Sequence, residues 1–181
     1  MVDIFPHKEI DRLPATKDLL YSNEVIAIVD DSPEITLLLE TYLNRQNINV
    51  VTARNGDEFF QILHEQNVAL VFLDIGLPGK NGIEILNELV PKHPDLGIIM
   101  VTGTTDVQTA VACIRQGADD YLTKPVSAEE FDHTLRHTLK KRRLAIENRM
   151  FQQELMSANF RMEFLHNLNF KMNSAYLNAM E

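Results

Sequence analysis

Short apolar runs alternate with segments of helical periodicity from residue 25 onward. Val25–Val29 is a continuous apolar run of the kind found in strands buried on both faces of a sheet. Ser32 and Pro33 follow it and suit the N-cap and the first residue of a helix. The same unit then repeats along the chain. We expect further strands at residues 48–53, 68–73, 98–101 and 121–122, and helices at residues 33–43, 56–66, 83–90, 106–115 and from 127 onward.

Five strands that alternate with five helices predict an α/β fold, a doubly wound parallel sheet with helices on both faces. In such sheets the functional crevice lies beyond the carboxyl ends of the strands. An aspartate directly after the apolar run 68–73 is costly to bury without a partner, which favours a functional role for it. The polar residues expected at these strand ends are Asp30, Asp31, Asp74, Thr102 and Lys124.

These side chains together suit a phosphoryl group. Three carboxylates at one edge of a sheet repel one another unless a cation lies among them. Oxygen ligands without histidine or cysteine select a hard ion such as Mg²⁺. A lysine and a threonine on neighbouring strand ends add a positive charge and a hydrogen-bond donor, which phosphoryl oxygens require.

The residues at four strand ends resemble the receiver domain of two-component response regulators. The resemblance covers about residues 24–142 and implies a flavodoxin-like sheet of order 2-1-3-4-5. The segments that carry it are Val29-Asp30-Asp31, Leu73-Asp74, Val101-Thr102-Gly103 and Tyr121-Leu122-Thr123-Lys124-Pro125.

The resemblance implies that Asp74 accepts a phosphoryl group from a histidine kinase or a phosphotransfer protein. It also implies that Asp31, Asp74 and the backbone carbonyl of Gly76 bind Mg²⁺ directly, while Asp30 acts mostly through a water molecule. A phosphatase of the haloacid dehalogenase type would carry a second aspartate at position 76 as its general acid. The glycine there argues against turnover of phosphate esters, so we expect only self-phosphotransfer and autodephosphorylation.

A conformational switch is a further implication of the resemblance. Lys124 pairs with the phosphate, Thr102 moves to form a hydrogen bond with it, and Tyr121 turns inward into the vacated space. The peptide bond between Lys124 and Pro125 is expected to be cis.

No glycine or proline occurs from Ser127 to Glu181, which predicts one long helix. A heptad seam runs along it, with asparagine at two a positions, a device that fixes register in parallel dimers. A two-stranded parallel coiled coil in a homodimer is the leading interpretation. Apolar residues off the seam, such as Phe160 and Phe164, leave open a wider bundle or coverage by a further domain. The seam consists of Leu144, Asn148, Phe151, Leu155, Ala158, Met162, Leu165, Asn169, Met172 and Tyr176.

Residues 163–171 faintly resemble the dimerisation-helix box of sensor histidine kinases. Phe170 stands where that box has its phosphorylatable histidine, and His166 lies one helical turn earlier. The alternative function is therefore a constitutive dimerisation or scaffold module with a degenerate kinase-like helix.

Composition excludes several classes of protein. The 181 residues carry a formal net charge of −9 and one cysteine, Cys113, so an internal disulfide is excluded and a reducing, cytoplasmic setting is favoured. No signal peptide and no membrane-inserted segment is expected. Residues 1–127 contain 9 basic and 19 acidic residues, a charge of −10, which argues against nucleic-acid binding. The basic run at residues 140–143 is interpreted as a solvated helix junction.

Three segments are expected along the chain. These are an N-terminal extension at residues 1–23, a receiver domain at 24–142, and a helical segment for dimerisation and signal transmission at 143–181. The helical pattern reaches Glu181 without a stop signal, which predicts that an output domain follows in the native protein.

Overall fold

The computed structural model describes residues 15–103 and 107–178, with side chains described up to residue 169 and at Met172. The chain forms two compact units, Met1–Arg143 and Leu144–Glu181. The elements in chain order are η1 Thr16–Leu19, β1 Val25–Val29, α1 Pro33–Asn44, β2 Val50–Ala53, α2 Gly56–Glu65, β3 Val68–Asp74, α3 Gly82–Lys92, β4 Gly97–Thr102, α4 Val107–Arg115, β5 Asp120–Thr123 and α5 Ala128–Asn178.

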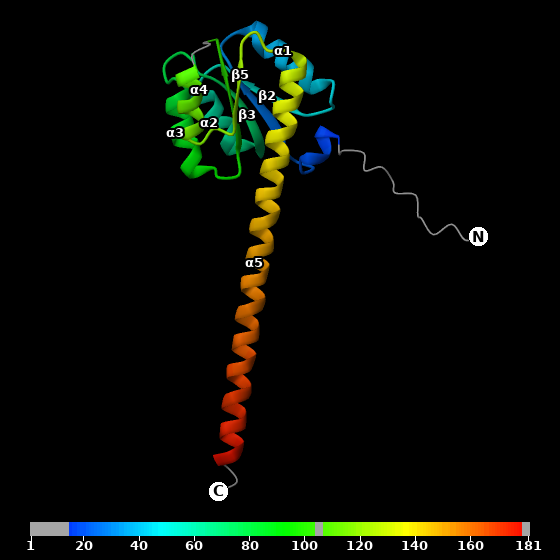
Figure 1. Ribbon diagram of the computed structural model, residues 1–181, viewed down its shortest axis with the longest axis vertical. Helices are drawn as coiled ribbons and strands as arrows, with labels where there is room; N and C mark the ends of the chain where they lie inside the picture. Colours follow the sequence, from blue (N-terminus) through cyan, green and yellow to red (C-terminus); the bar gives the residue numbers. More distant parts are fainter. Residues whose placement is uncertain (1–14, 104–106, 179–181) are drawn as a thin grey trace, which may run out of the picture. The chain divides into compact units, whose positions relative to one another are not determined.

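The first unit contains a parallel five-stranded sheet of order β2-β1-β3-β4-β5 (Figure 1). This order and the alternation of strands and helices confirm the predicted α/β class. In the centre of the sheet, Val29 of β1 lies opposite Leu73 of β3, so the residues that follow them meet at one edge. That edge holds the carboxyl ends of all five strands.

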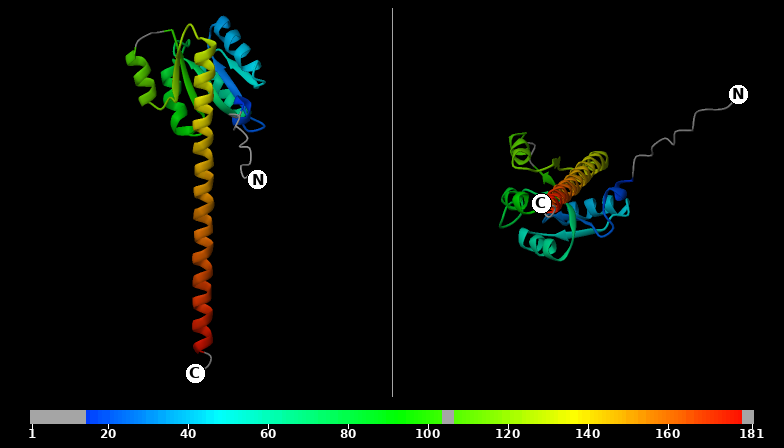
Figure 2. Two further views of the ribbon diagram at one scale, coloured as in Figure 1. Left: turned by 45° about the vertical axis from the view of Figure 1, so that its right-hand side comes forward. Right: turned by 90° about the horizontal axis from the view of Figure 1, so that it is seen from below.

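Helices cover both faces of this sheet (Figure 2), and an apolar core lies on each face. One core includes side chains of α2, α3 and α4, with Phe59 and Leu86 fully buried. The other includes side chains of α1, η1 and the first turns of α5, where Phe131 stacks on Phe72 of β3 at a centroid distance of 4.8 Å. The three central strands β1, β3 and β4 are therefore buried on both sides, which accounts for their apolar sequences.

Side-chain caps set the starts of the helices. Ser32 Oγ accepts a hydrogen bond from Ile35 N at 3.5 Å, and Pro33 is the first residue of α1, as predicted. Ser127 Oγ accepts from Glu130 N at 3.2 Å at the start of α5. Asn81 and Glu84 form a reciprocal capping box, so α3 begins at Gly82 and not at residue 83.

The second strand is shorter than predicted. It begins at Val50, and Ile48 belongs instead to the turn after α1, where its N–H donates to Leu43 O at 3.3 Å. Asn47 has a φ of 56°, a left-handed conformation that ends the helix and delays the strand. Ile48 is still buried, so its hydrophobicity indicated core position correctly but not strand conformation.

The segment before β1 is part of the first unit. Residues 16–19 form the short η1 helix, and Thr16 and Leu19 are buried. The first fourteen residues lie outside the described range. The basic run at 140–143 is not simply solvated as expected, because the side chain of Arg142 is only 8% exposed and pairs with Glu24. The partner lies 118 positions away in the sequence, too far for a local pattern to indicate it.

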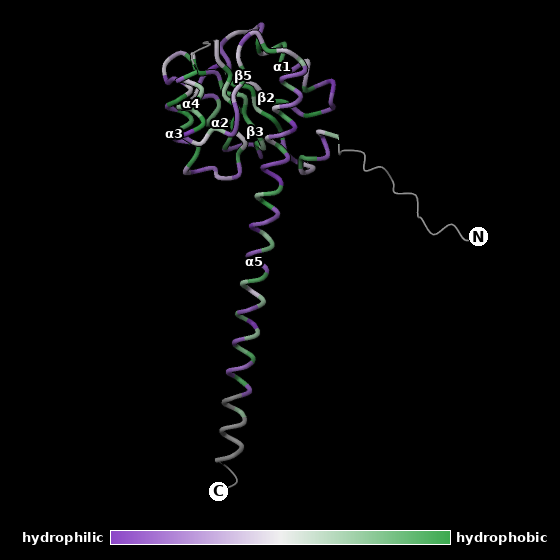
Figure 3. Tube along the Cα trace, viewed as in Figure 1, coloured by the Kyte–Doolittle hydropathy of each residue, from purple (hydrophilic) through white to green (hydrophobic). Residues whose placement is uncertain are grey.

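The second unit is the continuation of α5, and it mixes apolar and polar residues around its whole circumference (Figure 3). Exposed apolar residues lie both on the predicted seam, as with Phe151 and Leu155, and off it, as with Phe160 and Phe164. The side chains of Phe170 and Tyr176 lie outside the described set. Within the described residues, no helix combines the length and apolar character that spanning a membrane requires.

Replacement of Gly82 by alanine tests how tightly α3 packs against the end of β3. A Cβ at this position would lie 2.1 Å from the backbone oxygen of Asp74, so the helix start must shift. We expect Gly82→Ala to lower the free energy of unfolding by about 1–3 kcal/mol or more in urea denaturation. Gly103→Ala is the control, because its Cβ would meet nothing within 4 Å. Equal stabilities of the two variants would contradict this packing.

Candidate functional site

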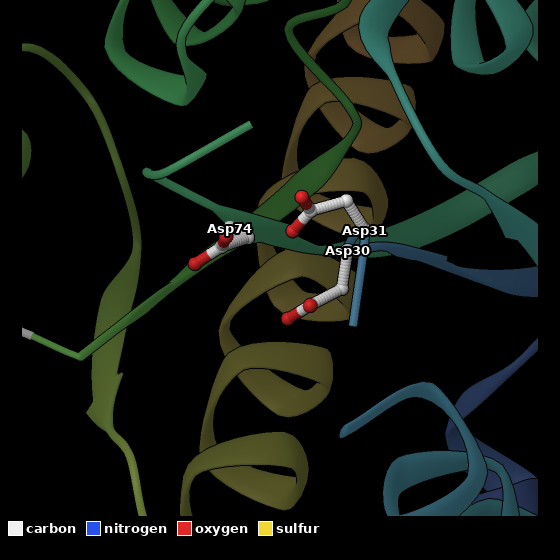
Figure 4. Close-up of side chains that lie close together, drawn as sticks. All are labelled: Asp30, Asp31 and Asp74. Atoms are coloured by element: carbon white, nitrogen blue, oxygen red, sulfur yellow. The ribbon is translucent and has the colours of Figure 1, made fainter. Parts of the chain in front are cut away.

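Three aspartates meet at the carboxyl edge of the sheet. Asp30 and Asp31 directly follow β1, and Asp74 is the last residue of the neighbouring strand β3. One carboxylate oxygen from each lies within 4.8 Å of the others, and Figure 4 shows the three side chains gathered at the strand ends. Asp30 and Asp74 are buried, whereas Asp31 is exposed. The parallel register therefore brings together residues that are 44 positions apart.

Lys124 supplies the positive charge of this cluster. Its Nζ lies 2.8 Å from Asp30 Oδ2 and 3.0 Å from Asp74 Oδ1, so one ammonium bridges two buried carboxylates. Its backbone N–H donates to Thr102 O at 2.7 Å, which ties the end of β5 to the end of β4. The Lys124–Pro125 peptide bond is cis, the geometry that the resemblance implies.

Burial and pairing act on the charges in opposite directions. Burial raises the pKa of the Asp30 carboxyl above its ordinary value, although the hydrogen bonds from Lys124 and Ser32 N oppose the shift. Burial alone would lower the pKa of Lys124, but its hydrogen bonds with Asp30 and Asp74 outweigh that effect and raise it. Lys124 is therefore held as a cation at the site.

The donor set fits a hard divalent cation. All three side chains offer oxygen, and three carboxylates face a single ammonium, which leaves an excess of negative charge. The main chain at Gly76 also approaches the cluster, since a Cβ there would lie 3.4 Å from Asp74 Oδ2. An open hollow of about 450 Å³ beside the cluster is lined by Asp30 and Asp31. Solvent and a small ion can reach the carboxylates through it.

The two residues of the expected switch lie on neighbouring strands. Thr102 ends β4 and is buried, 3% exposed, and it pairs in register with Thr123 of β5. Tyr121 lies on β5 opposite Met100, and its side chain is 38% exposed. The tyrosine is thus partly at the surface in this structure, which is the position from which an inward turn would start. Residues 104–106 lie outside the described range.

Gly82 is a residue of the site that the sequence reasoning missed. Its N–H donates to Ile75 O at 3.0 Å, and its lack of a side chain lets α3 begin against the backbone of Asp74. The signal was present in the sequence as the capping pair Asn81 and Glu84 around a glycine.

Comparison with known proteins gives a consistent result. Residues 26–136 match the sequence profile of the response regulator receiver domain. The probable transcriptional regulator ycf27 of Guillardia theta is 33% identical over 142 residues, which are 78% of this chain and 56% of that protein. Transcriptional regulatory protein SrrA of Staphylococcus aureus is 38% identical over 109 residues, 60% of this chain and 44% of SrrA. The chain therefore spans about half the length of these two relatives.

Solved structures agree with the sequence comparisons. The crystal structure of the receiver domain of NtrX from Brucella abortus is similar with a TM-score of 0.61 and 32% sequence identity. The match covers 64% of this chain and 98% of that domain. The similarity thus accounts for the globular part of the chain.

Replacement of Lys124 by methionine tests the charge balance of the site. The variant leaves two buried carboxylates without their cation, so we expect the free energy of unfolding at pH 7 to fall by about 1–3 kcal/mol. Since the pKa of Asp30 is already raised, loss of the cation moves it higher, and the destabilisation grows as pH rises through that pKa. The deficit relative to the wild type should therefore be largest near pH 8 and shrink toward about pH 5 in urea denaturation.

The exposed Lys92 offers the matched control, because its side chain is 65% exposed and its one ion pair is long. Lys92→Met should leave the stability nearly unchanged at every pH. A loss of stability in Lys124→Met that is the same at every pH would contradict the conclusion that Lys124 compensates the charge of buried carboxylates.

Proposed function

The chain belongs to the family of response regulator receiver domains, and we propose that Asp74 is the residue on which it accepts a phosphoryl group. Receiver domains as a family are phosphorylated in a Mg²⁺-dependent reaction and act in two-component signalling. The observation that carries the proposal is the ion-paired cluster in which Lys124 contacts both Asp74 and Asp30. Asp74 is the last residue of the central strand β3, and its carboxylate is in direct contact with the Lys124 ammonium.

The transfer begins with attack by a carboxylate oxygen of Asp74 on the phosphorus of a phosphohistidine. The new oxygen–phosphorus bond forms as the nitrogen–phosphorus bond of the donor breaks, and the histidine nitrogen keeps the electron pair and takes up a proton. The donor is a histidine kinase or a phosphotransfer protein. The product is an acyl phosphate, whose energy is conserved from the donor and is released on hydrolysis.

Lys124 has two roles in this scheme. Before transfer its ammonium offsets the charge of the buried Asp30 and Asp74 carboxylates. After transfer its Nζ forms an ion pair with a phosphoryl oxygen, because the carboxylate charge of Asp74 is lost when the acyl phosphate bond forms. The positive charge thus stays in place while its partner changes.

The residues that would hold Mg²⁺ are Asp31, Asp74 and the backbone carbonyl of Gly76, with Asp30 acting through a water molecule. A bound Mg²⁺ supplies charge neutralisation between the carboxylates and the incoming phosphoryl oxygens. The exposure of Asp31 and the hollow beside it support this role, since an ion must enter from solvent.

The switch would follow from the same chemistry. The hydroxyl of Thr102 moves to donate to a phosphoryl oxygen, and the ring of Tyr121 takes the space that opens inward. The two residues lie on adjacent strands, and β4 and β5 are hydrogen-bonded along their length. A displacement at the end of one strand would therefore also displace the other strand.

The output of the switch is proposed to be the association of the helix beyond residue 143. The seam from Leu144 to Tyr176 would pair two chains in parallel, and its described large apolar members are exposed in the single chain. The protein would then act in the cytoplasm as a homodimer that controls an output, without binding nucleic acid through this chain. Phosphorylation would change the strength or geometry of this dimer.

Asp74→Asn tests the acceptor assignment. We expect incubation with acetyl phosphate and Mg²⁺ to add one phosphoryl group to the wild type, and none to Asp74→Asn, as measured by intact mass. The reason is that an amide oxygen is too weak a nucleophile for this transfer. Asp57→Asn, at an exposed position in the first turn of α2, is the control and should be labelled as the wild type is. Full labelling of Asp74→Asn would exclude Asp74 as the acceptor.

A pair of neighbouring substitutions tests the seam. Leu155 lies at an a position and Met156 lies off the seam, and both are exposed in the single chain, at 52% and 72%. We expect Leu155→Asn to weaken dimerisation at least about tenfold in sedimentation equilibrium, because each dimer loses two buried leucines. Met156→Asn has the same effect on helix propensity and should change the dissociation constant little. Equal weakening by both substitutions would contradict a seam at these positions.

A further inference from the structure

Three consecutive basic residues near the end of the first unit all contact the globular part of the chain. Lys141, Arg142 and Arg143 lie on α5 just before the second unit begins at Leu144. A basic run of this kind on a helix surface is ordinarily solvated. Here the two arginines bind the segment before β1 and the lysine binds the segment before β5, at the edge of the sheet opposite to Asp74.

Arg142 makes the strongest of these contacts. Its Nη2 lies 2.5 Å from Glu24 Oε1 and its Nη1 3.2 Å from Glu24 Oε2, a bidentate pair with side-chain exposures of 8% and 3%. Its Nε also donates to Asp95 O at 2.5 Å. Glu24 Oε2 in turn accepts from Tyr21 N at 2.9 Å. A buried ion pair with these further hydrogen bonds holds α5 at one place against the segments before β1 and β4.

Arg143 extends the same attachment to η1. Its Nη1 donates to Asp18 O, and its guanidinium lies 5.6 Å from the centre of the Tyr21 ring. Arg143 thus contacts Tyr21, whose backbone N–H donates to the Glu24 carboxylate that Arg142 binds. Together they make a fixed base for the helix on residues 18–24.

Lys141 binds a different part of the sheet. Its Nζ lies 2.9 Å from Asp119 Oδ1, and Asp119 directly precedes β5. Asp119 Oδ2 accepts from Ile98 N at 3.0 Å, and its N–H donates to Ile98 O at 2.8 Å, so it also holds the start of β4. Lys141 is thus attached to the beginnings of β4, which ends at Thr102, and of β5, which ends just before Lys124.

We infer that Lys141, Arg142 and Arg143 form a clamp that carries the state of the Asp74 site to the helix beyond residue 143. Arg142 and Arg143 hold the base of the helix on segments that precede β1 and β4. Lys141 is bound through Asp119 to β5, the short strand that carries Tyr121, and therefore moves with that strand. When Tyr121 and Thr102 repack, β5 moves against the fixed base and Lys141 passes that movement into α5. The inference rests on the phosphorylation switch proposed above.

The neighbouring Lys140 shows why these contacts are specific. It is exposed and has no ion pair among the residues that the structure describes, although it carries the same charge on the same helix. A general attraction between a basic helix and an acidic domain would engage it equally. The clamp instead depends on which side chain reaches Asp119 or Glu24.

The experiment compares Lys141→Gln and Asp119→Asn with the control Lys140→Gln, all in the full chain. Asparagine at 119 keeps a side-chain oxygen for Ile98 N and removes only the charge. The dimer dissociation constant is measured by sedimentation equilibrium with Mg²⁺, in the presence and absence of beryllofluoride as the phosphate mimic. Affinity for the mimic is measured by calorimetry at chain concentrations where the protein is monomeric.

We expect the mimic to change the dissociation constant of the wild type and of Lys140→Gln by about tenfold, a usual size for coupling between two sites. In Lys141→Gln and Asp119→Asn the change should be less than about threefold, while the monomer binds the mimic as tightly as the wild type does. The double variant should lose no more than either single variant, because both break the same ion pair.

Two contrary outcomes have different meanings. If the wild type responds to the mimic and Lys141→Gln responds equally, the ion pair is only structural and the clamp is refuted, even if the variant unfolds at lower urea. If the wild type binds the mimic but its association does not change, the proposed switch fails and the clamp fails with it.

Discussion

The arrangement of this protein depends on the burial of two carboxylates at the ends of neighbouring parallel strands. Asp30 and Asp74 are almost inaccessible to solvent, and a third carboxylate, Asp31, lies close to both. One ammonium, from Lys124, faces them. Removing charge from water is costly unless it is compensated, so the site retains an excess of negative charge that a divalent cation can offset. This imbalance suits the edge of the sheet to Mg²⁺, and the cation together with Lys124 would offset the charge of a phosphoryl group there.

The sheet then connects this edge to the opposite one. Strands β4 and β5 end at Thr102 and next to Lys124, and they begin at the segment where Asp119 binds Ile98 and Lys141. Apart from Tyr121, their apolar residues are buried between two layers of helices, and such close packing favours a shift of the whole strand over local bending. Phosphorylation at the carboxyl edge can therefore change the positions of side chains at the amino edge, although those side chains do not contact the phosphate. The helix α5 is attached to the sheet at two places. Its first turns pack on one face of the sheet, and residues 141–143 form the clamp at the amino edge.

Much of the fold and most of the site followed from sequence, because buried parallel strands are apolar runs and their polar successors stand out. Asp74 after residues 68–73 is the clearest case. The predicted start of β2 was wrong because Asn47 adopts a left-handed conformation, which the hydrophobicity pattern does not indicate. The burial of Arg142 was missed because its partner Glu24 is distant in sequence, and a basic run on a helix looks the same whether it is solvated or bound. The roles of the seam residues stay predictions, since a single chain shows the exposed side chains but not what covers them.

The three aspartates are proposed to form one cation site whose charge is set by burial. Calorimetric titration of the chain with Mg²⁺ is the decisive measurement. We expect one ion per chain, an affinity that falls as pH is lowered and Asp30 takes up a proton, and loss of binding in Asp31→Asn. Absence of Mg²⁺ binding in the wild type, or equal binding in Asp31→Asn, would contradict it.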